Sequence, residues 1–411
     1  MRSRTGIAAT IGVVVAVLAA GLITWQPWSD DPGPCTIVSA DELDDTVVAG
    51  MGWLERALQD DGSFWYEYDR TADEFVPGYN HVRHAGTLMA LSQVAADGGE
   101  MAETATELID GGLGFVLDQL VTADDRTAFV EPGTPAKLGS TALVVATLAH
   151  LRIATGDDTH DDLLRSMGRF MQSLLRDDGG MWAEATGPDL EPRVGTTSTF
   201  YTGEAFWALA LLANVLPGEG WEESAEAVGY YIATARDEEE DIRIRPHADQ
   251  WAAYGFSEMR NWDVLEGEEL GYIIALIDRY HSRLKTEIGR EENRVGDGSG
   301  EPDETVTQSR GAGFGTTVEA LGSLWRLSAV DPGLSELESR LRQETLCGAS
   351  ILAARQLDAE RAATFASPER VEGAWFYLED ERAGLEGHFL TRVDDQQHAI
   401  SGVLRAIPAH G

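Results

Sequence analysis

Lysine is almost absent from this chain of 411 residues. Lys137 and Lys285 are the only two, so arginine supplies nearly all of the 31 basic residues. Seventy acidic residues outnumber them and give a formal net charge of −39 at pH 7. Because such a surface repels polyanions, we exclude nucleic acid as a partner. Proteins that stay soluble in strong brine have this composition, although drift of an ordinary acidic surface produces it too.

Cysteine is also scarce, since Cys35 and Cys347 are the only two. A structural zinc site built on cysteine needs more thiolates than this, and we predict neither a metal nor an organic cofactor. In an oxidising compartment the two cysteines can pair in a disulfide. The alternative is a buried thiol at Cys347 and a free one at Cys35.

Charge is absent from residues 6–28, which follow Arg2 and Arg4. This stretch is long enough to span a bilayer as a helix, and the basic flank places the N-terminus on the cytoplasmic side. We predict a single-pass anchor in the cell membrane over residues 1–28, a polar linker over 29–40 and an extracytoplasmic domain over 41–411. A cleaved signal peptide is the alternative, but no small-x-small cleavage site follows the apolar core.

The remaining chain contains a pattern that recurs six times. Each unit has a helical segment with a glycine close to an aromatic or aliphatic residue, at Gly52, Gly114, Gly168, Gly229, Gly271 and Gly348. A glycine inside a helix costs about 1 kcal/mol relative to alanine. Its recurrence therefore predicts close contact between helices at equivalent places.

After each of these helices comes a polar loop and then a second helix that is apolar or small on nearly every side. The six segments are 87–95, 140–154, 205–216, 251–259, 316–327 and 399–406. A helix that is apolar all round must be surrounded by protein, so these segments predict an inner ring. No alternating strand pattern competes with the helical one. We predict an all-α domain over residues 41–411, an (α/α)6 toroid of six helical hairpins.

Three loops share an acidic residue, a glycine and aromatic residues. They read Asp61-Gly62-Ser63-Phe64-Trp65-Tyr66, Asp178-Gly179-Gly180-Met181-Trp182 and Glu372-Gly373-Ala374-Trp375-Phe376-Tyr377. The run from Gln59 to Phe64 resembles the repeat signature of squalene cyclases and protein prenyltransferases, but the acidic motif of the former and the zinc ligands of the latter are missing. The six-hairpin count resembles the toroidal glycosidases, polysaccharide lyases and epimerases. This second resemblance implies a carbohydrate substrate.

The starts of the inner helices line one mouth of such a toroid, so polar residues there are candidate site residues. In the first repeat, Asn80, Arg83 and His84 are spaced to share one helix face, and Tyr79 precedes them. Tyr79 with Arg83-His84 is also similar to a signature of glucuronyl C5-epimerases. A helix cap with a structural arginine is the alternative explanation.

Other repeats add polar residues at equivalent places. The predicted substrate-binding residues outside the first helix start are Trp65, Tyr201, Gln308, Arg310 and His398, and Trp65 either stacks on a sugar or fills the core. The candidate catalytic carboxylates are Glu204, Asp394 and Asp395. We expect seven of these residues to approach one shared cavity mouth: Tyr79, Arg83, His84, Glu204, Gln308, Asp394 and His398.

Three functions are compatible with these residues. A glycoside hydrolase would use Glu204 with Asp394 or Asp395 as acid and base, because glycoside hydrolysis needs two carboxyl groups. A uronic-acid lyase or C5-epimerase would exchange a proton through Tyr79 and His84 while Arg83 binds the substrate carboxylate. The third is a non-catalytic toroid that binds a glycan or another protein.

A closed ring of six hairpins also makes a prediction about the cysteines. Cys35 precedes the first outer helix, and Cys347 lies in the sixth. Because the first and sixth repeats of a closed ring are neighbours, we predict a disulfide between Cys35 and Cys347.

Overall fold

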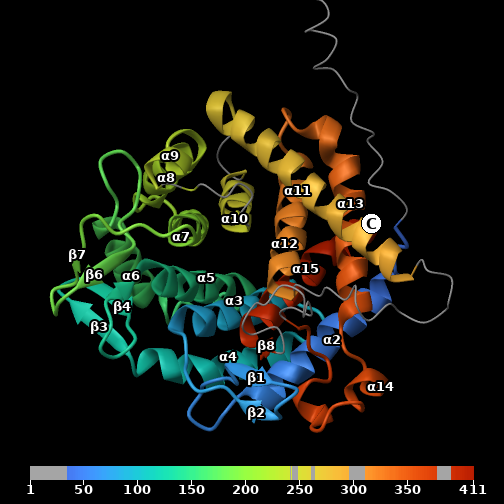
Figure 1. Cartoon of the computed structure of the whole chain (residues 1–411). Helices are drawn as coiled ribbons and strands as arrows, with labels where there is room; N and C mark the ends of the chain where they lie inside the picture. The colour runs from blue at the N-terminus through green and yellow to red at the C-terminus, as the bar shows by residue number, and fades with distance from the viewer. Residues whose placement is uncertain (1–34, 241, 243–248, 261–263, 296–310, 377–389) are drawn as a thin grey trace, which may run out of the picture. The chain divides into compact units, whose positions relative to one another are not determined.

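Helices of two kinds alternate along the chain and form an inner and an outer ring (Figure 1). The computed structural model describes residues 35–240, 242, 249–260, 264–295, 311–376 and 390–411. These belong to one compact unit, Cys35–Gly411. The predicted anchor over residues 1–28 lies outside the described residues, as do Gln308 and Arg310.

The inner ring contains six helices, each in contact with the next, and the last contacts the first. They are α3 (His81–Asp97), α5 (Leu138–Thr155), α7 (Tyr201–Val215), α10 (Gln250–Met259), α12 (Gly311–Ser328) and α15 (Val393–Ala406). Most of their described side chains are buried, as helices that are apolar on every side require. Of the described helices, α5 alone is long and apolar enough to cross a membrane, and it is largely buried in this ring.

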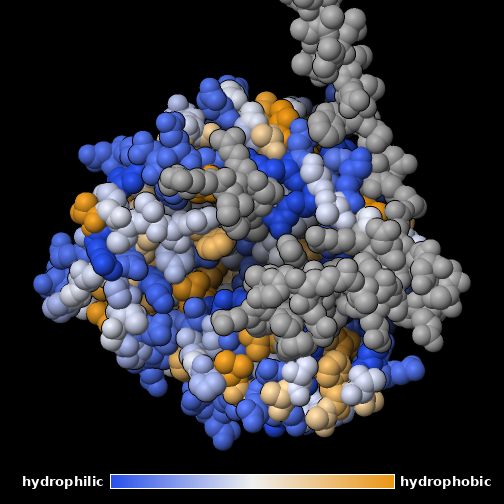
Figure 2. All heavy atoms as spheres, in the orientation of Figure 1, coloured by the Kyte–Doolittle hydropathy of each residue, from blue (hydrophilic) through white to orange (hydrophobic). Residues whose placement is uncertain are grey.

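The outer ring contains the partner helix of each hairpin. Its members are α2 (Ala40–Ala57), α4 (Ala102–Leu117), α6 (Asp161–Ser173), α8 (Trp221–Thr234), α11 (Gly267–Val295) and α13 (Glu338–Arg355). Short helices occupy some of the connections: α9 (Arg236–Glu239), α14 (Ala359–Ala362), η2 (Ser335–Leu337), η3 (Pro368–Arg370) and η5 (Ile407–His410). The predicted toroid of six hairpins is therefore confirmed over the described residues. Figure 2 shows that the face in view is largely hydrophilic, in keeping with the acidic composition.

The fold also contains short strands that the sequence did not predict. One sheet joins β1 (Glu67–Asp69) to β2 (Glu74–Phe75) and β8 (Leu390–Arg392), and so connects the first repeat with the sixth. The other two sheets contain β3 (Leu120–Ala123) with β4 (Arg126–Phe129), and β5 (Ala136–Lys137) with β6 (Glu184–Thr186) and β7 (Glu191–Pro192). Strands of two to four residues are too short to show an alternating pattern in the sequence.

The outer-helix glycines mark close contacts between helices at only some of the predicted positions. A Cβ atom would lie within 3.2 Å of a neighbouring helix at Gly168, Gly229 and Gly348. At Gly114 and Gly271 it would meet nothing within 4 Å, so the prediction is wrong there. In the first two repeats the close contacts between helices lie at Gly50 and Gly112, two residues before the predicted Gly52 and Gly114.

The three similar loops do adopt one shared conformation. Gly62, Gly179 and Gly373 have φ of +81°, +87° and +79°, which favours glycine. A Cβ on Gly62 would lie 2.7 Å from the carbonyl oxygen of Gly111 in α4, the next outer helix. A Cβ on Gly373 would lie 2.2 Å from the carbonyl oxygen of Ala49 in α2. The same turn that joins neighbouring repeats thus also closes the ring between the sixth repeat and the first.

Cys35 and Cys347 are joined in a disulfide at this closure, with their Cα atoms 5.8 Å apart. Beside it, the backbone N–H of Val38 donates to the hydroxyl of Ser350 at 3.1 Å. The segment before α2 is therefore fastened to α13, as the closed ring predicted.

Candidate functional site

The starts of all six inner helices surround a cavity of about 460 Å³. We call this cavity the N-terminal mouth. Six of the residues that the sequence singled out line it: Asn80, Arg83, Tyr201, Glu204, Asp394 and His398. Positive helix ends converge there, so the backbone itself favours negative charge.

Glu204 is a buried carboxyl group that forms no ion pair with another described residue. It lies in the first turn of α7 with 4% of its surface exposed, and its Oε2 has no hydrogen-bond partner among the described residues. Burial raises the pKa of Glu204 to about 8, and the nearby His398 offsets only part of that effect. At neutral pH this carboxyl group is therefore mostly protonated and able to donate its proton.

The absence of a side chain at Gly139, in the first turn of α5, creates room for Glu204. A Cβ on Gly139 would lie 2.1 Å from Oε2 of Glu204 and 2.4 Å from Cδ1 of Tyr201. Gly139→Ala is therefore expected to displace both side chains. If Glu204 takes part in a reaction, turnover should fall roughly 10²-fold, the usual effect of misplacing a reacting group by about 1 Å. Gly114→Ala on α4, where a Cβ would meet nothing, is the matched control and should leave turnover unchanged. Equal turnover in the two variants would contradict this role of Gly139.

Asp394 is a carboxylate held between two arginines. Nε of Arg392 donates to its Oδ1 at 3.0 Å, and Nε of Arg83 lies 3.0 Å from its Oδ2. Burial alone would raise the pKa of Asp394, but Arg392 and Arg83 outweigh burial and lower it. Asp394 is therefore ionised at neutral pH, in contrast to Glu204 on the same cavity.

Arg83 is itself held by further groups. Its Nη1 lies 3.4 Å from Oε1 of Glu67 and contacts the hydroxyl group of Tyr66. Because β1 and β8 pair Glu67 with Arg392, the small sheet places both arginines beside Asp394. The sheet between the first and sixth repeats thus positions the charged side of the mouth.

His398 is backed by a buried carboxylate. Its Nδ1 donates to Oε2 of Glu319 at 2.8 Å, and Oε1 of Glu319 accepts from the hydroxyl of Tyr254 at 3.1 Å. Burial by itself would lower the pKa of His398, but Glu319 raises it, with smaller contributions from the aspartates at the start of α15. With Nδ1 committed to Glu319, Nε2 is the nitrogen that can exchange a proton at the mouth, where it lies 3.4 Å from the amide nitrogen of Gln397.

No known protein family and no curated protein matches this sequence. Solved structures do match. A cellobiose 2-epimerase from Spirochaeta thermophila DSM 6192 has a TM-score of 0.61 at 15% identity, over 90% of this chain and 96% of that chain. A D-mannose isomerase has a TM-score of 0.59 at 13% identity, over 90% and 98%. An α-1,6-mannanase from Salegentibacter sp. HEL1_6 has a TM-score of 0.57 at 12% identity, over 90% and 99%.

All three span nearly the whole toroid domain rather than one part of it. The chain shares the α/α-toroid fold of these structures. At 12–15% identity the likeness establishes the fold alone. The chemistry of this toroid has to be argued from its own residues.

Tyr79 and His84 do not line the N-terminal mouth, contrary to prediction. His84 is buried between α3 and α4, where its Nε2 donates to the carbonyl oxygen of Gly112 at 3.1 Å. Its Nδ1 accepts from the hydroxyl group of Tyr79 at 2.6 Å. Burial lowers the pKa of His84 to about 4, so the ring stays neutral and hydrogen-bonded. This pair connects two helices of the toroid and is not placed to touch a substrate.

Two other predicted residues also lie away from the cavity. Trp65 is half-buried and packs edge-on against Trp53 of the core, with ring centroids 5.9 Å apart, and it does not line the mouth. Asp395 is fully buried and does not line the mouth, which leaves Asp394 as the accessible member of the pair. Asn80 lines the mouth but also caps α3, since its side chain accepts from the N–H of Arg83 at 3.2 Å.

The toroid also uses residues that sequence reasoning missed. Trp251 forms an aromatic wall of the mouth and stacks on Trp207 with ring centroids 5.6 Å apart. Glu319 is the carboxylate behind His398. Glu319 is the one acidic residue in the largely apolar segment 316–327, and this was a signal in the sequence that pointed to it. Within the described residues, no three His, Cys, Asp or Glu side chains are grouped to hold a metal ion.

Proposed function

We propose that the protein is a carbohydrate-active enzyme and that the N-terminal mouth is its active site. One observation carries the proposal: two carboxyl groups on one cavity are driven in opposite directions, with the pKa of Glu204 raised to about 8 and that of Asp394 lowered. Carboxyl groups whose environments separate their pKa values in this way are typical of acid–base pairs. The names of the structural relatives, which are sugar epimerases, a sugar isomerase and a mannanase, agree with a sugar substrate.

Glycoside hydrolysis is the reaction that this pair supports best. Glu204, protonated at neutral pH, would donate its proton to the glycosidic oxygen as the bond breaks. Asp394, ionised, would stabilise the positive charge that develops on the sugar ring or activate the attacking water. Trp251 would bind a sugar ring by stacking, and Arg83 would orient its hydroxyl groups.

Epimerisation or isomerisation of a sugar is the second candidate, and the Glu319–His398 pair favours it. A histidine backed by a buried carboxylate is a suitable base for removing a proton next to a carbonyl group. Glu204 in its protonated form could then polarise that carbonyl by donating a hydrogen bond. His398 would take the role that the sequence suggested for Tyr79 and His84, which are enclosed by protein.

Incubation of the protein with oligosaccharides in D₂O separates the two reactions. Hydrolysis releases new reducing ends and shortens the chains, whereas epimerisation exchanges a carbon-bound hydrogen for deuterium and leaves the chain length unchanged. Mass spectrometry and proton NMR of the products detect both results. A broad panel of α- and β-linked substrates that yields neither would refute the proposed function.

His398→Gln tests which reaction the mouth performs. If His398 is the base of an epimerisation, turnover should fall by about 10²–10⁴-fold, the usual contribution of such a group. If the protein is a hydrolase based on Glu204 and Asp394, the loss should be much smaller.

Glu319→Gln keeps the imidazole of His398 but removes the charge that raises its pKa. If His398 is the base, the acid limb of the pH profile of turnover should therefore move to lower pH. An unchanged acid limb would leave His398 without that role.

We also propose that residues 1–28 anchor the domain outside the cytoplasm. The uncharged stretch 6–28 and the disulfide, which needs an oxidising compartment, support this proposal. Protease added to intact cells should then release the toroid domain. Full protection of that domain would refute the proposal.

A further inference from the structure

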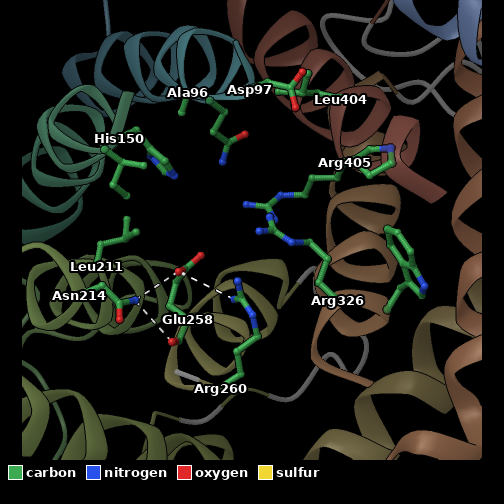
Figure 3. Close-up of a pocket in the computed structure, with 14 residues that line it drawn as sticks. Ala96, Asp97, His150, Leu211, Asn214, Glu258, Arg260, Arg326, Leu404 and Arg405 are labelled. Carbon is green, nitrogen blue, oxygen red and sulfur yellow. Dashed lines mark hydrogen bonds and ion pairs between the residues drawn. The ribbon is translucent and has the colours of Figure 1, made fainter. Parts of the chain in front are cut away.

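A second cavity opens where the six inner helices end, at the other end of the toroid from the N-terminal mouth. We call it the C-terminal mouth. Its volume is about 680 Å³, which lies in the usual range for small-molecule sites. Figure 3 shows Arg326 from α12 and Arg405 from α15 directed into this cavity, with their guanidinium groups next to each other.

Arg405 is a buried cation with unused hydrogen-bond donors. Only 7% of its surface is exposed, and its Nε and Nη1 have no hydrogen-bond partner in the part of the chain that the structure describes. Its Cζ lies 3.8 Å from the ring centroid of Tyr254, which fixes the guanidinium in place. A buried charged group with unmatched donors is costly unless a ligand supplies the acceptors.

Arg326 faces Arg405 and forms no ion pair with a carboxylate of the described residues, although Glu258 lies near enough to act on its charge. Among the described residues it makes no hydrogen bond or ion pair, in contrast to Arg260 in the same figure. Part of the Arg326 side chain stays accessible, but the cavity wall desolvates its guanidinium and lowers its pKa to about 10. The neighbouring charge of Arg405 adds to that effect, and Glu258 offsets part of it. The guanidinium groups of Arg326 and Arg405 carry like charges and repel each other. An anion bound between them would offset this repulsion.

Inner-helix C-termini carry partial negative charge, which offers another reason for arginines at this end. Arg260 has that role, since its Nη1 donates to the carbonyl oxygen of Ser257 at the end of α10 and lies 3.9 Å from Oε2 of Glu258. Arg326 and Arg405 show no such bonds. The charged residues that line the cavity are three arginines and two acidic residues, Glu258 and Asp97. Arginines thus outnumber acidic residues here, although the chain as a whole carries a net charge of −39.

His150 adds a hydrogen-bond acceptor to the same cavity. Its Nδ1 lies 2.8 Å from the carbonyl oxygen of Ala146, and since a carbonyl oxygen only accepts, Nδ1 carries the proton. Burial and the charge of Arg405 lower the pKa of His150 to about 3, so the ring is neutral. Its Nε2 is therefore an acceptor suited to a hydroxyl group.

We propose that the C-terminal mouth binds a small sugar or polyol that carries a phosphate or a carboxylate. The anionic group lies between Arg326 and Arg405, where planar guanidinium groups can each offer two parallel donors, and a hydroxyl group donates to His150. The site uses none of the residues of the N-terminal mouth. Failure of this proposal would therefore leave the proposed function untouched, and the reverse also holds.

Calorimetric titration of the protein at constant ionic strength tests the proposal with three probes: glucose 6-phosphate, glucuronate and glucose. Binding of one or both anions, but not of neutral glucose, is the expected result. The tighter of the two anions identifies the charged group as phosphate or carboxylate. Failure of both anions to bind, or binding of glucose with equal affinity, would overturn the proposal.

Two arginine variants assign the binding to this cavity. Arg326→Gln should weaken binding of the preferred anion at least about tenfold, because it removes charge-assisted hydrogen bonds. Arg326 has an accessible side chain, so the variant is expected to fold, and a thermal melt checks this. Arg260→Gln on the same cavity should change the affinity by less than about threefold, because Arg260 is already engaged with Ser257 and Glu258. Equal losses in the two variants would indicate unspecific attraction and overturn the proposal, as would no loss in Arg326→Gln.

Discussion

Glu204→Gln is expected to lower turnover by about 10²–10⁴-fold and at the same time to make the protein more stable at neutral pH. The loss of turnover follows from the proposed role, since glutamine occupies the same space but has no proton to transfer. The gain in stability follows from burial, since the wild-type carboxyl group resists ionisation where it lies. A carboxylate held by a buried ion pair would instead lose stability on replacement.

The sign of the stability change depends on pH. The pKa of Glu204 is raised from 4.5 to about 8 in the folded protein, so below pH 4.5 the group is protonated in both states and contributes no difference. Between the two values the unfolded chain has released its proton and the folded protein has not, so the wild type loses stability as pH rises. Above pH 8 the full cost applies, on the order of several kcal/mol. Glutamine avoids this cost, so the advantage of the variant should grow from pH 4.5 to pH 8 and then level off.

Urea denaturation of both proteins across this pH range measures the difference directly. Glu107→Gln, at an exposed position on α4, is the matched control and should change neither turnover nor the pH dependence of stability. Undiminished turnover in Glu204→Gln would remove Glu204 from the mechanism. A stability difference that does not vary with pH would show that the carboxyl group is not held protonated by the fold.

The sequence predicted the ring but not the direction of each side chain in it. Asn80, Arg83 and His84 were placed on one helix face by their spacing, yet Arg83 reaches the mouth while His84 faces α4. Successive residues on a helix are turned by about 100°, so adjacent residues of an inner helix meet different neighbours. An inner helix has three kinds of neighbour, namely the cavity, the next inner helix and the outer helix. Spacing within one helix cannot say which of these a given face meets.

Residues whose role depends on packing between distant repeats were harder to find. Glu319 belongs to α12 and His398 to α15, so their pairing depends on which inner helices adjoin. By contrast, Glu204 and Asp394 were found because a polar residue in the first turn of an apolar helix is conspicuous in the sequence. The opposite pKa shifts of the two carboxyl groups were not predictable. Arg83 and Arg392 pair with Asp394, whereas burial outweighs the charge of His398 at Glu204.

Removal of the disulfide is expected to lower the free energy of unfolding by about 5 kcal/mol in the chain-entropy model, and real values are often smaller. Cys35 and Cys347 are separated by 312 residues, so the bond restricts nearly the whole unfolded domain. Because this stabilisation acts on the unfolded state, the folded toroid and its N-terminal mouth should remain as they are. Turnover of Cys35→Ala/Cys347→Ala should therefore match that of the wild type at temperatures where both are folded.

Guanidinium denaturation of the oxidised wild type, the wild type kept reduced and the double variant measures this effect. The free energies of unfolding of the reduced wild type and of the double variant should agree, because each lacks the same covalent link. Each single variant should lose nearly as much as the double variant, since either replacement breaks the bond, and this non-additivity distinguishes a disulfide from two separate packing contributions. Additive losses, or two free thiols in the unreduced protein by mass spectrometry, would contradict the bond. In that case Gly373, which packs on Ala49, and the sheet of β1 and β8 would have to hold the first and sixth repeats together without a covalent link.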